Sequence, residues 1–540
     1  LIEAAVIGGA ATMLGLALGH ALASGLVDLM LSTIGDLYFT STVTAAEPSA
    51  LIYWKGLAIG VLTTLLAALA PALEVANSAP NAAMSRAALE QTARRVSRSG
   101  ARLALPVIAL GSLFFIVAPR SLFVGFAGLF LIIVAGALLI PAGTTLLLRF
   151  AEPAAERVFG IPGSLAVRGV SASLSRTGVA TAALSVAVAT VIGVGVMIGS
   201  FRVSLAQWLD ATLIADVYLS VPDSTATQNG FTEARLTAIE ALPEVAGISL
   251  SRFTTLPTVD GELNVRAIQP GPQGWGLTLL SESPDNALQR LSAAEGVMIS
   301  EPYSYRRQLS VGDDLVLPAA EGDKAFLILG IYRDYISDGG SVLMPLDLYR
   351  REWNDPRVGG VGVYFHATTD RSSARTAIRA LVSGTPSIRF RSNDAIRKRS
   401  MEVFDRTFKI TEVLRVLAGI VAFLGLVSAL LSIELERARE TAILRALGLT
   451  PRQIGTLALT QTGLLGLAAG LLSIPLGVMM AALLVFIINQ RSFGWSMGLT
   501  VEPAPLLLGI ALALSAALLA GIYPAARAGR SSVATQLREE

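Results

Sequence analysis

Between two long apolar runs, the chain reads Glu434-Leu-Glu-Arg-Ala-Arg-Glu-Thr-Ala-Ile-Leu-Arg-Ala-Leu-Gly-Leu-Thr-Pro-Arg-Gln-Ile454. Charged residues alternate here with alanine, isoleucine and leucine at helical spacing, which predicts a helix with one apolar and one solvated face. Gly448 predicts the end of this helix, and Thr450-Pro451 predicts the N-cap and first residue of the next one. We therefore expect a rigid, charged elbow between two membrane spans, with one face able to dock on a partner.

The composition indicates the broad class of protein. Hydrophobic residues make up 53% of the 540 residues, charged residues make up 15%, and the mean hydropathy is +0.62. Soluble domains carry about 25% charged residues, so we expect an integral membrane protein with a soluble part. The net charge of +2 comes without a basic patch interleaved with aromatic residues, so nucleic-acid binding is not expected. The absence of cysteine excludes disulfides and thiolate chemistry in these residues.

Eight apolar runs predict membrane spans, most of them long enough to cross about 30 Å of hydrocarbon. The third run is short, so it could instead form a re-entrant hairpin with the fourth. Arginines crowd the loops that would lie on the elbow's side of the membrane, which predicts that the elbow is cytoplasmic. Leu1 follows no basic segment, so we expect the chain to begin inside a larger protein. The runs cover about 4–31, 56–75, 102–118, 122–148, 177–200, 412–433, 456–488 and 504–524.

One large polar block, residues 202–411, interrupts the spans. Alternating apolar residues predict strands within it, and helical spacing predicts helices at 232–242 and 371–382. The predicted strands are 215–221, 296–300, 314–318, 326–331 and 360–366. We therefore expect an α-helical integral membrane protein, with about eight transmembrane helices and one extracytoplasmic α+β domain.

The two ends of the chain share a pattern. Leu14-Gly-Leu-Ala-Leu-Gly19 is similar to Leu465-Gly-Leu-Ala-Ala-Gly470, and in each case a span ending in a proline follows, at Pro71 and at Pro524. This predicts that residues 1–86 are the back half of a unit whose full copy is about 164–540.

The elbow sequence Arg437-x-Arg-Glu-Thr-Ala-Ile-Leu-Arg-Ala-Leu-Gly448 resembles the signature of FtsX-like or MacB-type permeases, the type VII ABC transporter superfamily. The resemblance extends over the order of parts in 164–540 and implies a ten-span, two-unit member that is truncated at its N-terminus. Its implied parts are the last two spans of a first unit (1–86), a linker with two extra spans (87–163), an amphipathic helix and first span (164–201), the extracytoplasmic domain (202–411), and the second span, coupling helix, last two spans and tail (412–540).

The resemblance implies a multi-pass permease subunit in the bacterial cytoplasmic (inner) membrane, and not an enzyme. The sequence has no Gly-x-x-x-x-Gly-Lys-Ser/Thr loop, so ATP and Mg would belong to a separate ABC ATPase and this chain would hold no cofactor. The elbow would contact that ATPase, although it could also be a solvated connector stabilised only by its own ion pairs. The implied coupling residues are Glu436, Arg439, Glu440, Ala442, Leu444, Arg445 and Gly448.

The implied function is to couple ATP hydrolysis to movements of the extracytoplasmic domain, with export or extraction of a lipophilic, lipoprotein or peptide substrate. The alternative is a mechanotransmitting regulator of an envelope partner, such as a cell-wall hydrolase, without transport. An apolar groove between spans would favour transport, whereas an apolar patch on the domain would favour an extracytoplasmic partner protein. A membrane-bound enzyme or solute carrier that works without an ATPase would need carboxylates or lysines within the spans, which have almost none. Membrane lipids are expected partners in every case.

Few residues suggest chemistry. His20 and His366 are far apart in the chain, so neither a metal site nor a catalytic triad is expected. Asp334 and Asp338 are expected to form a turn rather than a catalytic acid and base. The glycines of 193–199 and 419–425 would allow close helix packing, or would simply be tolerated facing lipid.

Overall fold

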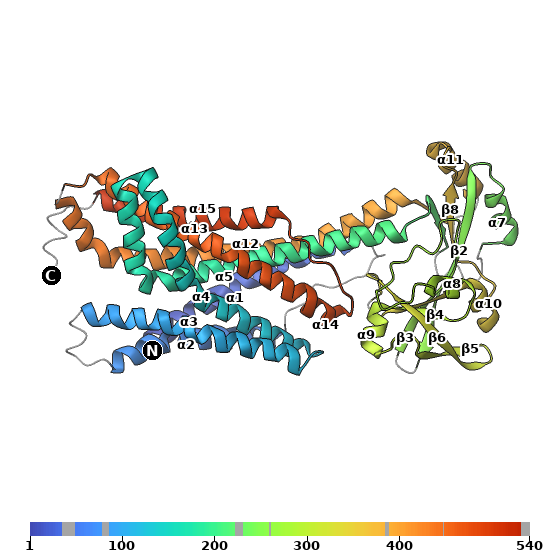
Figure 1. Cartoon of the computed structure of the whole chain (residues 1–540), viewed down its shortest axis with the longest axis horizontal. Helices are drawn as coiled ribbons and strands as arrows, with labels where there is room; N and C mark the ends of the chain where they lie inside the picture. Colours follow the sequence, from blue (N-terminus) through green and yellow to red (C-terminus); the bar gives the residue numbers. More distant parts are fainter. Residues whose placement is uncertain are drawn as a thin grey trace.

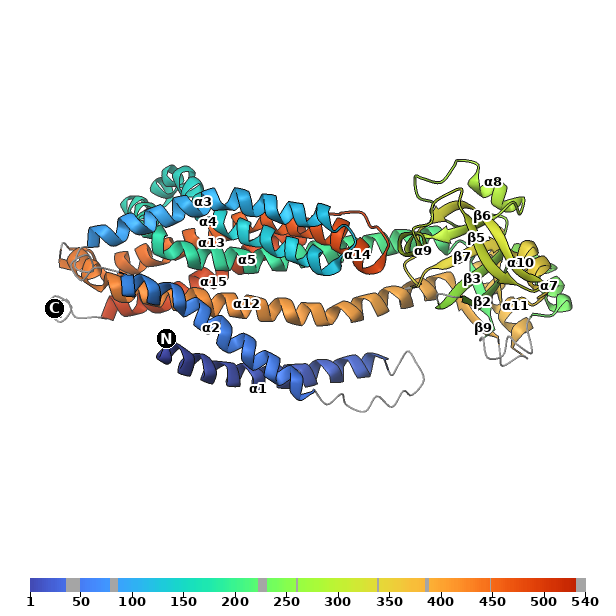
Figure 2. The same ribbon diagram turned by 90° about the horizontal axis from the view of Figure 1, so that it is seen from below.

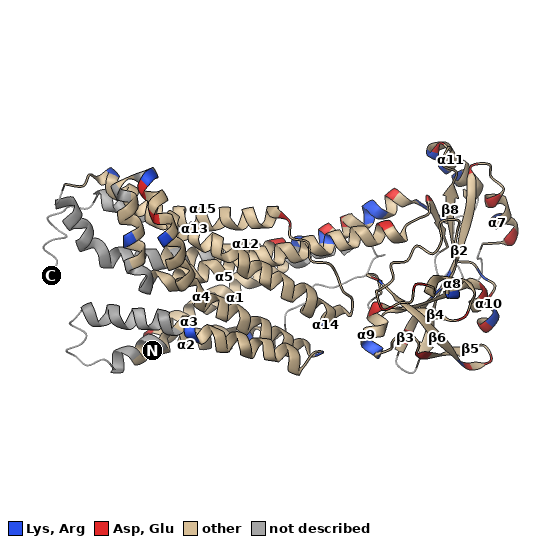
Figure 3. Ribbon diagram, in the orientation of Figure 1, with Lys and Arg blue, Asp and Glu red and all other residues tan. Residues whose placement is uncertain are grey.

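The computed structural model describes residues 1–34, 49–77, 86–221, 231–258, 261–337, 339–383, 388–446 and 448–530. The molecule is elongated, with a bundle of long helices at one end and a mixed α/β domain at the other (Figure 1). Two helices, α5 (Ile161–Thr212) and α12 (Asn393–Ala446), run from the bundle into the domain. Figure 3 shows that charged residues gather at the ends of the molecule and along the stalk formed by these helices, and that the middle of the bundle is nearly free of them.

The remaining bundle helices are α1 (Ile2–Ile34), α2 (Ala50–Asn77), α3 (Arg86–Val117), α4 (Leu122–Phe159), α13 (Pro451–Leu483), the π-helix η1 (Leu484–Ile488), α14 (Asn489–Phe493) and α15 (Pro503–Arg530). By length and composition, 7 helices in the described part of the chain can cross a membrane, and they correspond to seven of the eight predicted spans. The remaining prediction, 412–433, falls on α12, where several side chains lie outside the description. Figure 2 places α1 and α2 beside α12, away from α3 and α4.

The short third run proves to be part of a long antiparallel pair. Helices α3 and α4 lie side by side along the bundle, and each contains a candidate span, which favours two spans over a re-entrant hairpin (Figures 1 and 2). Helix α13 lies against α5 and α15, with glycine at the closest approaches. A Cβ on Gly477 of α13 would lie 2.8 Å from the carbonyl oxygen of Ala189, and a Cβ on Gly193 of α5 would lie 3.0 Å from the carbonyl oxygen of Gly477, so the predicted close packing occurs at Gly193. Gly419 and Gly425 on α12 have no described atom that near.

The domain is built on one nine-stranded sheet of order β5-β6-β4-β7-β3-β2-β8-β1-β9, in which the β3–β7 and β4–β6 pairs are parallel. Its strands are β1 (Val217–Ser220), β2 (Val245–Thr258), β3 (Gly261–Gln269), β4 (Val297–Ser300), β5 (Asp314–Ala319), β6 (Gly322–Tyr332), β7 (Ser341–Pro345), β8 (Gly360–Phe365) and β9 (Arg389–Ser392). Its helices are α7 (Glu233–Glu240), α8 (Ala287–Ser292), α9 (Glu301–Arg307), α10 (Leu346–Trp353) and α11 (Arg371–Val382).

All five predicted strands and both predicted helices of the domain are present, so the α+β prediction is confirmed. The sequence missed β2 and β3, whose polar residues interrupt the alternation, and the short strands β7 and β9. Strand β7 is buried along its whole length and therefore has no period of two. The stretches 202–212 and 393–411, inside the predicted domain block, continue the two span helices as the stalk.

A buried ion cluster ties β2 to the segment after α10. Asp355 accepts hydrogen bonds from Arg252 at 3.2 Å, from the Tyr349 hydroxyl at 3.2 Å and from Arg357 at 2.6 Å. Burial alone would raise the pKa of Asp355, but the hydrogen bonds from Arg357 and the charge of Arg252 outweigh it and lower this pKa to about 2. The carboxylate therefore stays charged and stabilises the domain at neutral pH.

Candidate functional site at the junction of bundle and domain

The stalk is a pair of helices held together by two ion pairs. Arg202 on α5 donates to both carboxylate oxygens of Asp405 on α12, at 3.0 and 3.3 Å. Closer to the domain, Arg397 on α12 pairs with Asp210 on α5 at 2.6 Å. All four side chains are about half exposed, so each pair contributes little to stability but fixes the register of the two helices.

An aromatic cluster fills the space where the stalk leaves the bundle. Phe201 of α5 lies at its centre, with its ring centroid 5.0 Å from Phe404 of α12 and 4.8 Å from Trp495 of the α14–α15 loop. Tyr335, from the domain, lies 4.8 Å from Trp495 and 5.8 Å from Trp208. Edge-on and tilted aromatic pairs contribute about 0.5–1.5 kcal/mol each beyond their buried area. The cluster therefore joins both stalk helices, the loop and the domain into one packed unit.

Hydrogen bonds attach the α14–α15 loop to the domain and to the stalk. The Ser496 amide donates to the Glu301 carboxylate at 2.9 Å, and the Tyr335 hydroxyl donates to the Ser496 carbonyl at 3.0 Å. On the stalk side, the Thr500 amide donates to the Ser200 hydroxyl at 2.9 Å. The Trp208 indole also donates to the Arg333 carbonyl of the domain at 3.0 Å. Movement of the domain must therefore strain or break these contacts.

Glu301 is the titratable group inside this junction. It is 6% exposed, and its second carboxylate oxygen has no hydrogen-bond partner among the described residues. Burial raises the pKa of Glu301, and its hydrogen bonds to Ser496 oppose only part of that shift. A buried carboxylate without full hydrogen bonding is costly when it is charged. The junction is therefore more stable when Glu301 is protonated.

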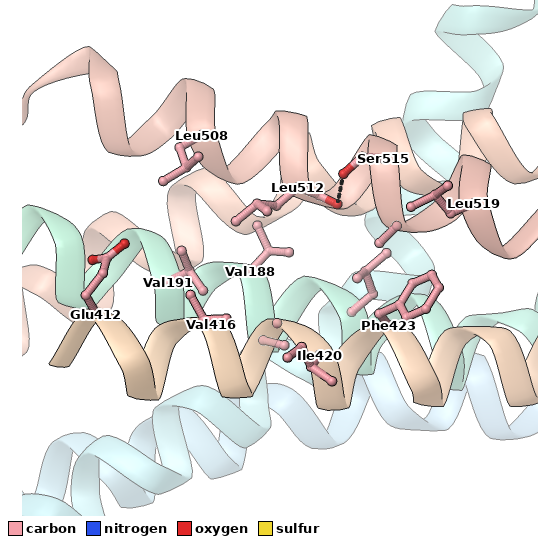
Figure 4. Close-up of a pocket in the computed structure, with 14 residues that line it drawn as sticks. Val188, Val191, Glu412, Val416, Ile420, Phe423, Leu508, Leu512, Ser515 and Leu519 are labelled. Atoms are coloured by element: carbon pink, nitrogen blue, oxygen red, sulfur yellow. Dashed lines mark hydrogen bonds between the residues drawn. The ribbon is translucent and has the colours of Figure 1, made fainter. Parts of the chain in front are cut away.

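An apolar cavity of about 350 Å³ lies deeper in the bundle, between α5, α12 and α15. Figure 4 shows Glu412 at one end of it and Leu519 at the other. Ile420 and Leu508 are 50% and 42% exposed, so the cavity opens toward the surrounding lipid. Its volume is within the range of small-ligand sites. The labelled lining residues are Val188, Val191, Glu412, Val416, Ile420, Phe423, Leu508, Leu512, Ser515 and Leu519.

The elbow lies at the far end of the bundle from the domain. Helix α12 continues without a break through it to Ala446, so six of the seven predicted coupling residues share one helix with the stalk. The side chains of these six residues lie outside the described part of the chain. Gly448 has φ +101°, which favours glycine and allows the chain to turn. Thr450 caps α13 in a capping box with Gln453, which confirms the predicted helix start.

The residues considered for catalysis or metal binding lie apart from one another. The Nδ1 atom of His20 is 2.9 Å from the Tyr53 hydroxyl within the α1–α2 pair, whereas His366 lines a polar cavity of the domain. Asp334 accepts hydrogen bonds from the Ile336 amide and the Ser341 hydroxyl, as expected of a turn-forming residue. Asp338 lies outside the described residues. Among the described residues, three or more histidine, aspartate or glutamate side chains nowhere gather as metal ligands would.

Sequence reasoning missed the junction itself. Phe201, Tyr335, Phe404 and Trp495 come from four separate segments and meet only in the folded chain. The signal available was the position of aromatic residues near the ends of predicted spans, where amphipathic rings are favoured.

This architecture, a bundle of candidate spans carrying one α+β domain on two extended helices, defines a multi-pass membrane protein. Two family models match it in chain order: the MacB-like periplasmic core domain over residues 177–381, and the FtsX-like permease C-terminal domain over residues 413–533. An uncharacterized ABC transporter permease protein of Mycobacterium tuberculosis is 35% identical over 554 residues, covering 100% of this chain and 64% of that protein. This chain thus spans a little under two thirds of the curated relative it matches.

Two solved structures are similar to part of the chain. The periplasmic region of MacB from Actinobacillus actinomycetemcomitans is 11% identical, covers 36% of this chain and 95% of that one, and gives a TM-score of 0.26. The extracellular domain of the noncanonic ABC-type transporter YknZ from Gram-positive bacteria is 12% identical, covers 33% and 99%, and gives 0.25.

Residues 413–533 thus match an FtsX-like permease and residues 177–381 match a MacB-like periplasmic core domain, as the elbow sequence predicted, and the relative that matches along this chain is an ABC transporter permease. The chain is a multi-pass protein of the bacterial cytoplasmic (inner) membrane.

Proposed function

We propose that this chain is a transmission subunit, which carries movement from a separate ABC ATPase at the cytoplasmic elbow to the extracytoplasmic domain. The observation that carries the proposal is the continuity of α12, one helix from Asn393 beside the sheet to Ala446 in the elbow. A hydrogen-bonded helix resists bending more than a loop does, so a tilt imposed at the elbow reaches the domain. Helix α5 would move with α12, because Phe201 of α5 packs against Phe404 of α12 and the ion pairs of Arg202 and Arg397 join the same two helices.

The cargo we favour is lipophilic: a lipid, a lipoprotein or an amphipathic peptide, exported or extracted from the membrane. The apolar cavity supports this choice because α5 and α12, the two moving helices, form two of its three walls. A tilt of the stalk would therefore change its shape and displace an acyl chain held there. Burial of each methylene group contributes about 0.8 kcal/mol, enough for a short chain to be retained.

The second candidate is a regulator that pulls on an envelope partner without transport. The tight junction around Glu301 and Tyr335 favours it, because transmission to the domain would need no cargo in the cavity. Both candidate functions need the separate ATPase and the stalk helices. They differ only in whether a cargo molecule enters the apolar cavity.

The experiment reconstitutes the full-length protein with its ATPase in nanodiscs. Glu440→Lys combined with Arg445→Glu should abolish ATPase binding, because charge reversal would oppose a docking surface. Lys409→Pro should leave ATPase binding intact but uncouple the domain, since proline interrupts a helix at that point of the stalk. Lys409→Ala is the matched control, because Lys409 is exposed and alanine favours helix. Unchanged ATPase binding in the elbow variant, or unchanged domain movement in Lys409→Pro, would refute the proposal.

A further inference from the structure

A second cavity, of about 820 Å³, lies where the α3–α4 turn, the end of the α13 span and helix α9 of the domain meet. It is separate from the apolar cavity and from the aromatic junction. Two arginines and no carboxylate are among its described lining residues. Those that matter here are Phe115, Arg120, Ser121, Tyr305, Phe486 and Arg491.

Among the described residues, uncharged groups hold Arg491 in place, including the Phe115 ring, whose centroid lies 5.8 Å from the guanidinium carbon. Arg491 donates to the Phe115 carbonyl at 2.8 Å and to the Ser121 carbonyl at 3.1 Å, so uncharged acceptors orient its guanidinium. A Cβ on Gly125 would lie 3.0 Å from the Arg491 Nη1 atom, so a residue without a side chain leaves room for it. Arg120 is exposed and contacts the uncharged amide of Gln308 at the end of α9. The cavity therefore keeps two positive charges.

Both arginines lie at the extracytoplasmic border of the membrane. Arg120 is in the short turn between the candidate spans 100–117 and 122–157, and Arg491 is near the end of the span 451–493. Arginine is disfavoured in short external loops because it opposes correct insertion. Two arginines thus converge on one cavity at a level of the membrane where arginine is disfavoured.

The walls around these charges are apolar and face lipid. Ile116, Phe123 and Phe486 are 74%, 84% and 54% exposed beside the cavity. Phe486 is presented by the π-helix Leu484–Ile488, a distortion that occurs frequently at functional sites. A ligand that fits has an anionic head for the arginines and hydrocarbon chains for the exposed aromatic and aliphatic side chains.

We infer that this cavity binds the phosphate headgroup of an anionic phospholipid from the outer leaflet, with its acyl chains along the exposed side chains of α3, α4 and η1. Arginine suits phosphate because its planar guanidinium donates two parallel hydrogen bonds. Tyr305 belongs to the domain whereas the arginines belong to the bundle, so the bound lipid touches both. The inference rests on this cavity alone and stands whether or not the proposed function is right.

The test is native mass spectrometry of the delipidated full-length protein, titrated separately with phosphatidylglycerol, phosphatidylcholine and inorganic phosphate. We expect one phosphatidylglycerol to bind more tightly than phosphatidylcholine. Arg120→Gln should weaken phosphatidylglycerol binding about tenfold, the effect of one hydrogen bond to a charged group. Arg120→Lys should keep most of the affinity, because it keeps the charge. Arg235→Gln, on α7 at the far side of the domain, removes one positive charge elsewhere and should change nothing (Figure 1).

Three results would overturn the inference. Equal binding of the two lipids would mean that charge is not recognised, and equal binding in Arg120→Gln and Arg235→Gln would place the lipid elsewhere. Inorganic phosphate binding as tightly as phosphatidylglycerol would assign the cavity to the free anion. Misfolding does not confuse the result, because Arg120 is exposed and its replacement disturbs no packed side chain. The Arg120→Lys variant also tests the same position with its charge kept.

Discussion

Gly477 provides a direct test of how α5 and α13 are packed. In Gly477→Ala the new Cβ would lie 2.8 Å from the Ala189 carbonyl oxygen and 2.8 Å from both Cβ and Cγ2 of Ile192. Carbon atoms prefer about 3.5–4.0 Å, so the helices must separate by roughly 0.7–1.2 Å or Ile192 must leave its site. Ile192 is 0% exposed, so it cannot move without displacing the side chains packed around it. Overpacking of this kind costs about 1–3 kcal/mol, and we expect the free energy of unfolding to fall by that amount.

The assay is thermal unfolding of the detergent-solubilised full-length protein, followed by the fraction that remains monodisperse. Gly425→Ala is the matched control: it is also a helical glycine, but no described atom lies within 4 Å of its Cβ position. It should be neutral or slightly stabilising, because alanine favours helix over glycine by up to about 1 kcal/mol. Gly193→Ala added to Gly477→Ala should cost less than the sum, since both widen one interface. Equal midpoints for Gly477→Ala and Gly425→Ala would refute the packing argument.

Three other predictions concern the junction, the domain and the apolar cavity. Because burial raises the pKa of Glu301, the thermal midpoint should fall as pH rises above 4.5, and Glu301→Gln should remove this slope; an unchanged slope would exclude Glu301 as its source. Asp355→Asn should lower the free energy of unfolding of the domain by about 3 kcal/mol, because it leaves Arg252 buried without its anion. The lowering of the Asp355 pKa from 3.8 to about 2 corresponds to about 2 kcal/mol, which the wild-type protein should lose as the pH falls from about 5 to about 2, as denaturant unfolding at both pH values would show. Leu512→Trp should reduce lipid-stimulated ATPase activity by filling the cavity, whereas Leu507→Trp, 65% exposed and outside it, should not; equal effects would remove the cavity from the mechanism.

Much of the fold could be predicted because it depends on local periodicity. The elbow helix, its end at Gly448 and the capped start at Thr450 follow from residues a few positions apart. Strands with alternating burial, such as β5, were found for the same reason. Strand β2 was missed because its serine, threonine and arginine residues interrupt the alternation, and its place in the sheet is set by pairing with β3 and β8.

The site was harder to predict because its parts are distant in the sequence. Phe201 and Trp495 are separated by most of the chain, and only the fold brings their rings to 4.8 Å. The apolar cavity could not be predicted either. An apolar residue that lines a cavity, such as Ile420, cannot be distinguished in the sequence from one that only faces lipid. The coupling role of Glu440 and Arg445 stays a prediction, because it rests on the resemblance of the elbow to its family.

The central claim is that α12 carries movement from the elbow to the domain, and one distance measurement tests it most directly. The 540 residues contain no cysteine, so spin labels can be placed by Asp347→Cys on the domain and Phe123→Cys on the bundle, both 84% exposed. Electron spin distances between them would be compared with the ATPase partner empty and trapped with ATP. We predict a shift of several ångströms on ATP binding that Lys409→Pro abolishes. An unchanged distance with ATP bound, or the same shift in Lys409→Pro, would contradict the claim.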